Sequence, residues 1–183
     1  MTKILPLTAI PKEAQNQVLR QAAQIFFETA HIKVFDSILE QEAFYQRWFG
    51  HYLDADPGAF LIAVDKNGAA IGYLAGCLDS FSKNASAIVE DIAFYTPDFF
   101  DAIRAYPSHL HINVKPGHQG QGVGSLLMQR YFELCRDKGS SGIHVVTDAT
   151  SRAVRFYRRC GFTAFMPPGA DPDLALLVRA LPA

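Results

Sequence analysis

The spacing of hydrophobic residues changes along the chain between a period typical of helices and one typical of strands. Residues 4–7 predict a short strand, and a helix is expected to begin at Pro11, a residue that suits a first helical turn. Four apolar residues of this helix recur at the spacing of a single face: Val18, Ala22, Ile25 and Phe26. A second helix is expected over residues 39–52.

Two strands joined by a turn are expected next. Residues 59–64 (AFLIAV) and 69–78 (AAIGYLAGCL) predict strands, and the Asn67-Gly68 pair between them is typical of a hairpin turn. Serines and an asparagine predict a loop over residues 80–86, and the segment PDFFDAIRAY predicts a short helix.

The second half of the chain alternates between strands and helices. Strands are expected over residues 109–114, 143–146 and 174–181, and helices over 121–138 and 151–160. The first of these helices carries its predicted core face on Val123, Leu126, Leu127, Tyr131 and Leu134. The second carries it on Ala153, Phe156, Tyr157 and Cys160. This order predicts an α/β (α+β) fold with a mixed sheet, in one domain over residues 1–183.

Composition and charge exclude several classes of function. The chain has 183 residues, of which 17 are basic and 18 acidic, so it lacks the net positive charge expected of a nucleic-acid-binding protein. No apolar run approaches the ~20 residues of a membrane span, and the N-terminus does not resemble a signal peptide. Three widely spaced cysteines fit buried, reduced thiols in a cytoplasmic protein, and their spacing offers no metal framework.

The segment HINVKPGHQGQGVGSLLM (111–128) is rich in glycine, a residue without a side chain, between a predicted strand and a predicted helix. Its four glycines are Gly117, Gly120, Gly122 and Gly124. A helix N-terminus carries unpaired N–H groups and partial positive charge, and glycine lets an anion approach the backbone closely. A phosphate-bearing ligand is therefore expected here, and a tight turn without a ligand is the alternative.

The glycine spacing distinguishes between known phosphate loops. The P-loop pattern is absent, and G-x-G-x-x-G fails because Ser125 or Leu127 stands where its third glycine would be. The arrangement Gln119-x-x-Gly122-x-Gly124 instead resembles the pyrophosphate loop of the GNAT superfamily of acyl-coenzyme A N-acyltransferases, whose pattern is [QR]-x-x-G-x-[GA].

Two further segments carry the resemblance. TSRAVRFYRRCGF (150–162) is similar to the superfamily's N-x-x-A-x-x-F-Y-x-x-x-G-F segment, with Thr150 in place of the usual asparagine. YPSHLHINVKPGHQGQGVG and the ending DPDLALLVRAL resemble the acetyltransferase-like C-terminal domain of the O-GlcNAc hydrolase and its bacterial relatives. The resemblance implies a GNAT fold and acetyl transfer from acetyl-CoA, without a metal, to a primary amine of a small molecule or peptide. A catalytically weak or inactive acetyl-CoA-binding module is the alternative. The protein is expected to be a monomer or a homodimer in either case.

The resemblance also implies where acetyl-CoA binds. The sheet is expected to splay after Val114, with pantetheine pairing along the backbone of residues 112–114 and the pyrophosphate on the amides of residues 120–124. The implied contacts are Ile112, Asn113, Val114, Gln119, Gly120, Gln121, Gly122, Val123, Gly124, Ser125, Thr150, Arg152 and Phe156. The other arginines of the segment, at 155, 158 and 159, are expected on a solvated helix face.

Catalysis requires a partner for the leaving thiolate, and the resemblance assigns this role to Tyr157. A phenol has a pKa near 10 and a thiol a pKa near 8.5, so complete proton transfer is uphill by ~2 kcal/mol. A hydrogen bond in the transition state is therefore expected. A core position on the apolar helix face is the alternative for Tyr157.

Candidates for the general base lie on the strand before the loop. His109, His111 and Asn113 share one face of that strand, and the two histidines could serve in the acceptor site, pair on a metal or simply pack. Glu90 and Asp91 are alternative bases. The expectation is that activity rises from about pH 6 to 8, with the histidines supplying part of the rise.

An aromatic-rich stretch of about thirty residues separates the strands at 69–78 and 109–114. Its rings are Phe81, Phe94, Tyr95, Phe99, Phe100 and Tyr106. They could wall the acceptor pocket, pack on the sheet or form a dimer contact.

Overall fold

The structure is a computed structural model that describes residues 1–91, 97–165 and 171–182. The chain divides into two compact units. Unit 1 comprises residues 1–76 and 111–131, and unit 2 comprises residues 77–110 and 132–183. A single domain over residues 1–183 stays a prediction.

The strands form a seven-stranded sheet in the order β1-β2-β3-β4-β5-β7-β6. Their bounds are Lys3–Pro6 (β1), Phe60–Val64 (β2), Ala70–Cys77 (β3), Ser108–Val114 (β4), Gly142–Asp148 (β5), Thr163–Phe165 (β6) and Leu174–Ala180 (β7). The pairs β1–β2, β2–β3, β5–β7 and β6–β7 are antiparallel, whereas β4 and β5 are parallel. The expected mixed sheet is therefore confirmed, and the short strand β6 is an addition to it.

The helices differ from the expected ones in two places. Their bounds are Lys12–Thr29 (α1), Ile38–Tyr45 (α2), Gln46–Gly50 (η2, a π-helix), His51–Ala55 (α3), Ser86–Asp91 (α4), Pro97–Ala105 (α5), Val123–Asp137 (α6) and Arg152–Arg159 (α7), with 3-10 turns at Leu7–Ala9 and Lys83–Ala85. The helix expected over 39–52 is thus interrupted by a π-helical turn. The loop expected over 80–86 is partly helical, because a 3-10 turn leads directly into α4.

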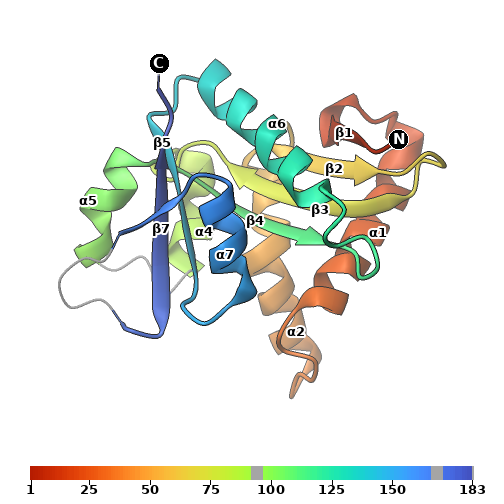
Figure 1. Ribbon diagram of the computed structural model, residues 1–183. Coiled ribbons are helices and arrows are strands. Elements are labelled where there is room, and N and C mark those ends of the chain that lie inside the picture. The colour runs from red at the N-terminus through yellow and green to blue at the C-terminus, as the bar shows by residue number, and fades with distance from the viewer. Residues whose placement is uncertain (92–96, 166–170, 183) are drawn as a thin grey trace. The chain divides into compact units, whose positions relative to one another are not determined.

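In unit 1, α1 buries the four apolar residues expected on its core face. The start of α2 is capped by Ser37, whose Oγ accepts a hydrogen bond from the backbone N–H of Glu40 (3.1 Å). Strands β2 and β3 are buried along their whole length. Gly76 of β3 permits α6 to lie against the hairpin, because a Cβ atom there would collide with the ring of Tyr131 (Figure 1).

The core face of α6 is rotated relative to the expected one. Val123, Leu127 and Tyr131 are buried as expected, but Leu126 is 41% exposed and Leu134 is only partly buried. The remaining buried residues of the helix are Met128, Phe132 and Cys135. Successive helical residues are about 100° apart, so a face centred on Leu127 and Met128 leaves Leu126 outside the buried arc.

Unit 2 is organised around the antiparallel pair β5–β7, which spans seven residues of each strand. Phe99 and Ile103 of α5 pack on Leu176 and Val178 of β7, with Tyr106 and Val146 at the edge of this cluster. The guanidinium of Arg179 donates a hydrogen bond to the carbonyl oxygen of Cys160 at the end of α7, and it lies 4.1 Å from the ring centroid of Phe132. This contact fixes the C-terminal end of α7.

The cysteines follow expectation in two of three cases. All are free thiols, and Cys77 and Cys135 are buried, but Cys160 is partly exposed. Within the described residues, no helix combines the length and the apolar character needed to cross a membrane.

Candidate functional site

The loop between β4 and α6 has a backbone shape that requires glycine. Gly117, Gly120 and Gly122 have φ values of 84°, 75° and 85°, a region that side chains with a Cβ rarely adopt. A Cβ atom built at any of the three would meet nothing within 4 Å, so the space beside the loop is open. Gly124 lies in the first turn of α6 and is not in this region. The loop glycines therefore serve the turn itself while leaving room for a ligand.

Two glutamine side chains hold the loop in shape. Nε2 of Gln119 donates a hydrogen bond to the carbonyl oxygen of Val114 (3.0 Å), and Nε2 of Gln121 donates one to that of Gly117 (2.7 Å). The backbone N–H of Leu126 donates to the carbonyl oxygen of Gly122 (3.0 Å), which closes the first helical turn. The N–H groups ahead of Leu126 open α6 and are available to an anion by the geometry of any helix start.

Strands β4 and β5 are parallel, in a register that joins Ser108 to Ile143 and His109 to His144. A splay of the sheet after Val114 stays a prediction. The backbone N–H of Lys115 still donates to the carbonyl oxygen of Ile71 (2.9 Å), so the other edge of β4 is paired to its end.

His111 of β4 lies in a network of unit 1. Its Nδ1 lies 3.2 Å from the hydroxyl oxygen of Tyr73, and that oxygen accepts a hydrogen bond from Nδ2 of Asn113 (2.9 Å). The rings of Phe26 and Trp48 lie 5.9 and 5.8 Å from the imidazole, between centroids. Trp48 comes from the π-helical turn η2, a kind of helix segment that is frequent at functional sites.

Burial lowers the pKa of His111 from 6.5 to about 4, although the residue as a whole is only partly buried. A histidine with so low a pKa is neutral at neutral pH, which does not favour a contribution of His111 to a rise in activity between pH 6 and 8. The catalytic role of His111 stays a prediction.

His109 lies in unit 2 in a closed, polar setting. Its Nδ1 is 2.8 Å from Oγ of Ser80, and its ring centroid is 5.3 Å from that of His144. Desolvation, and secondarily the neighbouring His144, hold its pKa well below the usual 6.5. With only 3% of the residue exposed, His109 is placed for packing rather than for contact with an acceptor. A catalytic role for it is not supported by this setting.

Tyr157 of α7 is almost fully buried in unit 2, with its ring 5.4 Å from Phe156 and 5.5 Å from Phe162 between centroids. Burial, and secondarily Cys160, raise the pKa of its phenol above the usual 10. Complete proton transfer to a thiolate is then less favourable than the sequence argument assumed. A hydrogen bond without transfer is the chemistry that this side chain can offer.

The turn before α7 is built on Asp148. Its Oδ1 accepts hydrogen bonds from both the backbone N–H and the hydroxyl of Thr150, each at 2.6 Å. Ser151 caps the helix, since its Oγ accepts from the backbone N–H of Ala153 (3.1 Å). The hydroxyl hydrogen of Thr150 is thus used within the turn. Arg155, Arg158 and Arg159 are exposed as expected, and Arg152, an implied coenzyme contact, is exposed too.

Comparison with protein families identifies the chain. The model of the acetyltransferase (GNAT) family matches residues 19–162. The chain belongs to this family. Streptothricin acetyltransferase from Streptomyces lavendulae is 28% identical over 110 residues, which cover 60% of this GNAT chain and 46% of that protein. The chain therefore spans less than half the length of this relative.

Solved structures show the same fold. The crystal structure of SsHAT matches with a TM-score of 0.72 and 19% identity, over 100% of this chain and 99% of that one. A GNAT superfamily phosphinothricin acetyltransferase from Sinorhizobium meliloti, solved in complex with AcCoA, matches with a TM-score of 0.60 and 18% identity, over 98% of this chain and 88% of that one.

The described rings of the aromatic stretch in this GNAT protein differ in burial. Phe99 and Tyr106 belong to the core of unit 2, as the packing alternative expected. Phe81 and Phe100 are 50% and 37% exposed. Phe94 and Tyr95 lie outside the described residues. Glu90, one of the alternative bases, is exposed on α4, and Asp91 ends that helix.

The aromatic rings near His111 come from other parts of the GNAT chain, and sequence reasoning missed them. Phe26 lies on α1, Trp48 on η2 and Tyr73 on β3. Tyr73 is the one aromatic residue in the strand AIGYLAGC, and a buried hydroxyl on such a strand was the available signal. Trp48 gave no signal by spacing, because a π-helical turn has no simple sequence pattern.

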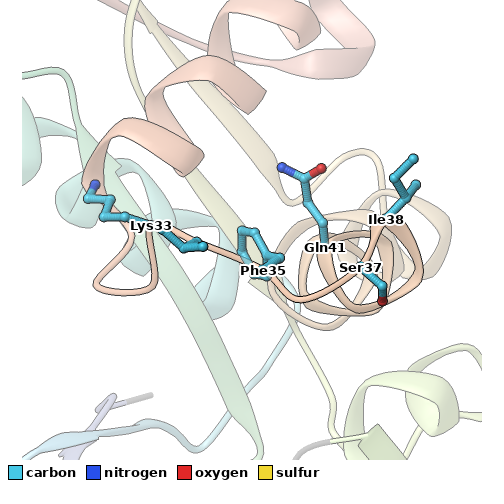
Figure 2. Close-up of a pocket in the computed structure, with 6 residues that line it drawn as sticks. Lys33, Phe35, Ser37, Ile38 and Gln41 are labelled. Carbon is cyan, nitrogen blue, oxygen red and sulfur yellow. The ribbon is translucent and has the colours of Figure 1, made fainter.

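A surface hollow of about 460 Å³ lies in unit 1 at the junction of α1 and α2 (Figure 2). Its lining residues are Lys33, Val34, Phe35, Ser37, Ile38 and Gln41. Val34 and Ile38 are 82% and 84% exposed. The ring of Phe35 lies 5.3 Å from that of Phe44, between centroids, which connects the hollow to the aromatic cluster around Phe26. The lining contains no carboxylate that would attract a cationic acceptor.

Among the described residues of this GNAT protein, no three histidine, cysteine, aspartate or glutamate side chains lie close enough to hold a metal ion. A metal-free reaction stays a prediction. The pairing of His109 with His111 on a metal gains no support, since each histidine has its own separate hydrogen-bond partner.

Proposed function

We propose that this protein is an N-acetyltransferase that moves the acetyl group of acetyl-CoA to the primary amine of a small-molecule acceptor. The observation that carries the proposal is the loop between β4 and α6. Three glycines give it a left-handed backbone, Gln119 fixes it to the end of β4, and it delivers the N-terminus of α6 to open space. These features suit a pyrophosphate.

The residues of unit 1 fit acetyl-CoA along its length. We propose that the backbone N–H and C=O groups of residues 112–114 pair with the amides of pantetheine, as the family resemblance implies. The pyrophosphate then lies on the amides of residues 120–124, with Ser125 beside it. Contacts from Thr150, Arg152 and Phe156 of unit 2 are proposed from the family resemblance alone.

The reaction needs no redox partner. A neutral amine attacks the thioester carbonyl, a C–N bond forms, and the C–S bond breaks to release coenzyme A as a thiolate. The nitrogen loses one proton and the thiolate gains one, so protons balance. We assign the hydrogen bond to the departing sulfur to Tyr157, consistent with a phenol whose pKa lies above its usual value.

The acceptor must supply its amine in the neutral form. A lysine-like amine is about 0.1% neutral near pH 7.4, whereas an amine of lower pKa is largely neutral there. A weakly basic small molecule is therefore favoured as the acceptor over a polycationic peptide. The names of the streptothricin and phosphinothricin acetyltransferases support a small-molecule acceptor.

The resemblance to the O-GlcNAc hydrolase domain stays a prediction. The alternative that the protein is an inactive binding module stays a prediction too. Both readings share coenzyme binding, so binding is tested first. Acetyl-CoA at 100 times its dissociation constant is expected to stabilise the protein by ~2.7 kcal/mol, measured as a rise in melting temperature. NAD serves as the control, since it has a pyrophosphate but no pantetheine. Equal stabilisation by NAD, or none by acetyl-CoA, would refute the proposed site.

A further inference from the structure

The hydrogen bonds of three buried or partly buried histidines define which ring nitrogen carries the hydrogen in each. A neutral imidazole has one N–H donor and one acceptor nitrogen, and the partners of Nδ1 decide between the two forms. His109, His111 and His144 each have a recorded partner at Nδ1. The three partners differ in kind.

For the two histidines of unit 2, Nδ1 must be the donor. The hydroxyl of Ser80 donates its hydrogen to the carbonyl oxygen of Pro107 (2.7 Å), so towards His109 its oxygen accepts. Nδ1 of His144 lies 2.6 Å from the carbonyl oxygen of Tyr106, which can only accept. Both rings are therefore in the Nδ1–H form.

For His111, the partner of Nδ1 is a hydrogen-bond donor rather than an acceptor. The hydroxyl oxygen of Tyr73 accepts a hydrogen from Nδ2 of Asn113, which favours donation of its own hydrogen onward to Nδ1 of His111. Nδ1 then acts as the acceptor, and the ring hydrogen lies on Nε2. Two histidines that are two residues apart on β4 are thus expected in opposite tautomers.

We propose that Tyr73 and Asn113 are positioning residues that hold His111 as a neutral hydrogen-bond donor through Nε2–H, directed at the thioester oxygen of acetyl-CoA. The assignment of His111 to this step rests on the proposed acetyltransferase function. His111 keeps its proton throughout, so it stabilises the negative charge that develops on the oxygen and does not take the proton of the amine.

The surroundings of His111 favour a donor over a base. A base needs a lone pair facing the substrate, whereas here the lone pair at Nδ1 faces the Tyr73 hydroxyl. A donor that is already oriented, in a site lined by Phe26 and Trp48, stabilises developing charge more than it would in water. His111 remains partly exposed, so a ligand can reach it.

The tautomers can be determined by NMR, without an activity assay. Protein labelled with ¹⁵N is examined by long-range ¹H–¹⁵N correlation spectra at pH 7.5, with each histidine assigned by a His→Gln variant. His111 is expected as Nε2–H, and His109 and His144 as Nδ1–H. In Tyr73→Phe, which lacks the hydroxyl, His111 is expected to shift toward a mixture, while His109 and His144 stay unchanged. An Nδ1–H form of His111 in the native protein, or no change in Tyr73→Phe, would overturn the proposal.

Kinetics then test the role as a donor. His111→Leu is expected to lower kcat by ~10²–10³-fold, whereas His111→Gln, which retains an N–H donor, is expected to keep clearly more activity. Equal losses in the two variants would refute the donor role and favour a base. Tyr73→Phe and Asn113→Ala are expected to lower kcat with unchanged acetyl-CoA affinity, and Tyr106→Phe is the matched tyrosine control. Absence of turnover in the native protein would refute the proposed function, while the tautomer result would stand by itself.

Discussion

The side-chain amide of Gln119 donates a hydrogen bond to the carbonyl oxygen of Val114, with 3.0 Å between the two heavy atoms. This bond joins the middle of the glycine loop to the last residue of β4. It therefore couples the two segments that the proposed site uses, the strand edge for pantetheine and the loop for the pyrophosphate. The glutamine of the family pattern thus acts as a brace, which means that its side chain fixes the loop to the end of β4.

We predict that Gln119→Ala weakens acetyl-CoA binding by about tenfold, since loss of one hydrogen bond near a charged ligand is worth roughly 1–1.5 kcal/mol. The loop is on the surface, so the melting temperature is expected to change little. Isothermal titration calorimetry measures the affinity. Gln129→Ala, an exposed glutamine on α6, is the matched control, and equal affinities of both variants would argue against the brace.

Two substitutions at Gly124 distinguish a side chain that blocks the ligand from one that strains the backbone. This glycine opens α6 without a left-handed backbone, so a side chain is tolerated by the helix itself. We predict that Gly124→Val abolishes acetyl-CoA binding with little loss of thermal stability, because its branched side chain would cover the amides of the first turn. Gly124→Ala, which the family pattern allows, is predicted to retain binding. If calorimetry shows normal binding by the valine variant, the pyrophosphate lies elsewhere.

Gly122 is a less clean probe of ligand approach than Gly124. Its φ of 85° means that a side chain strains the backbone whatever the ligand does. For Gly122→Val we predict a loss of stability of about 1–2 kcal/mol. Thermal unfolding of Gly122→Val and Gly124→Val without ligand tests this difference.

For Tyr157→Phe we predict a fall in kcat of ~10²-fold with little change in acetyl-CoA affinity, because the hydrogen bond to sulfur forms mainly in the transition state. The phenyl ring keeps the contacts with Phe156 and Phe162, so packing is preserved. Steady-state kinetics with saturating acetyl-CoA measure the effect. A variant with native kcat would return Tyr157 to a purely structural role.

The buried histidines predict a dependence of stability on pH. Burial lowers the pKa of His144 from 6.5 to about 4 in the folded protein. Above about pH 6.5 the residue is neutral in both the folded and the unfolded protein, so it does not lower the free energy of unfolding. As the pH falls from 6.5 toward 4, the unfolded chain binds a proton that the folded chain does not, so the free energy of unfolding falls. The slope approaches 1.4 kcal/mol per pH unit for each such histidine.

Urea denaturation at several pH values between 4 and 7.5 measures this slope. His144→Gln is predicted to reduce it, together with a lower stability at pH 7 from the lost hydrogen bond to Tyr106. An identical slope in the variant and the native protein would show that His144 is not the group responsible.

The elements with strong local signals were predictable from the sequence. The face of α1 and the β2–β3 hairpin follow from periodicity and from the Asn67-Gly68 turn. The π-helical turn η2 and the strand β6 were not predictable, since the first looks like continuous helix and the second has only three residues. Leu126 was misplaced because neighbouring apolar residues on a helix allow more than one core face.

The candidate site, like the fold, was predictable from the sequence only in part. The loop of residues 117–124 was found because a simple turn needs one glycine and this loop has four. Neither the Tyr73–His111–Asn113 network nor the separation of His109 from His111 was predictable, because β3 contributes Tyr73 from 38 residues away. Alternation along β4 placed both histidines on one face, but their partners depend on segments distant in sequence.

Acetyl transfer to an amine is measured most directly by the release of the coenzyme A thiol. The protein is incubated with acetyl-CoA and a panel of small primary amines spanning low and high pKa, and free thiol is followed with a chromogenic disulfide reagent. We predict thiol release that depends on an amine, is fastest with weakly basic amines and is lost in Gly124→Val. Firm binding of acetyl-CoA with no amine-dependent release from any member of the panel would contradict the account and identify a binding module.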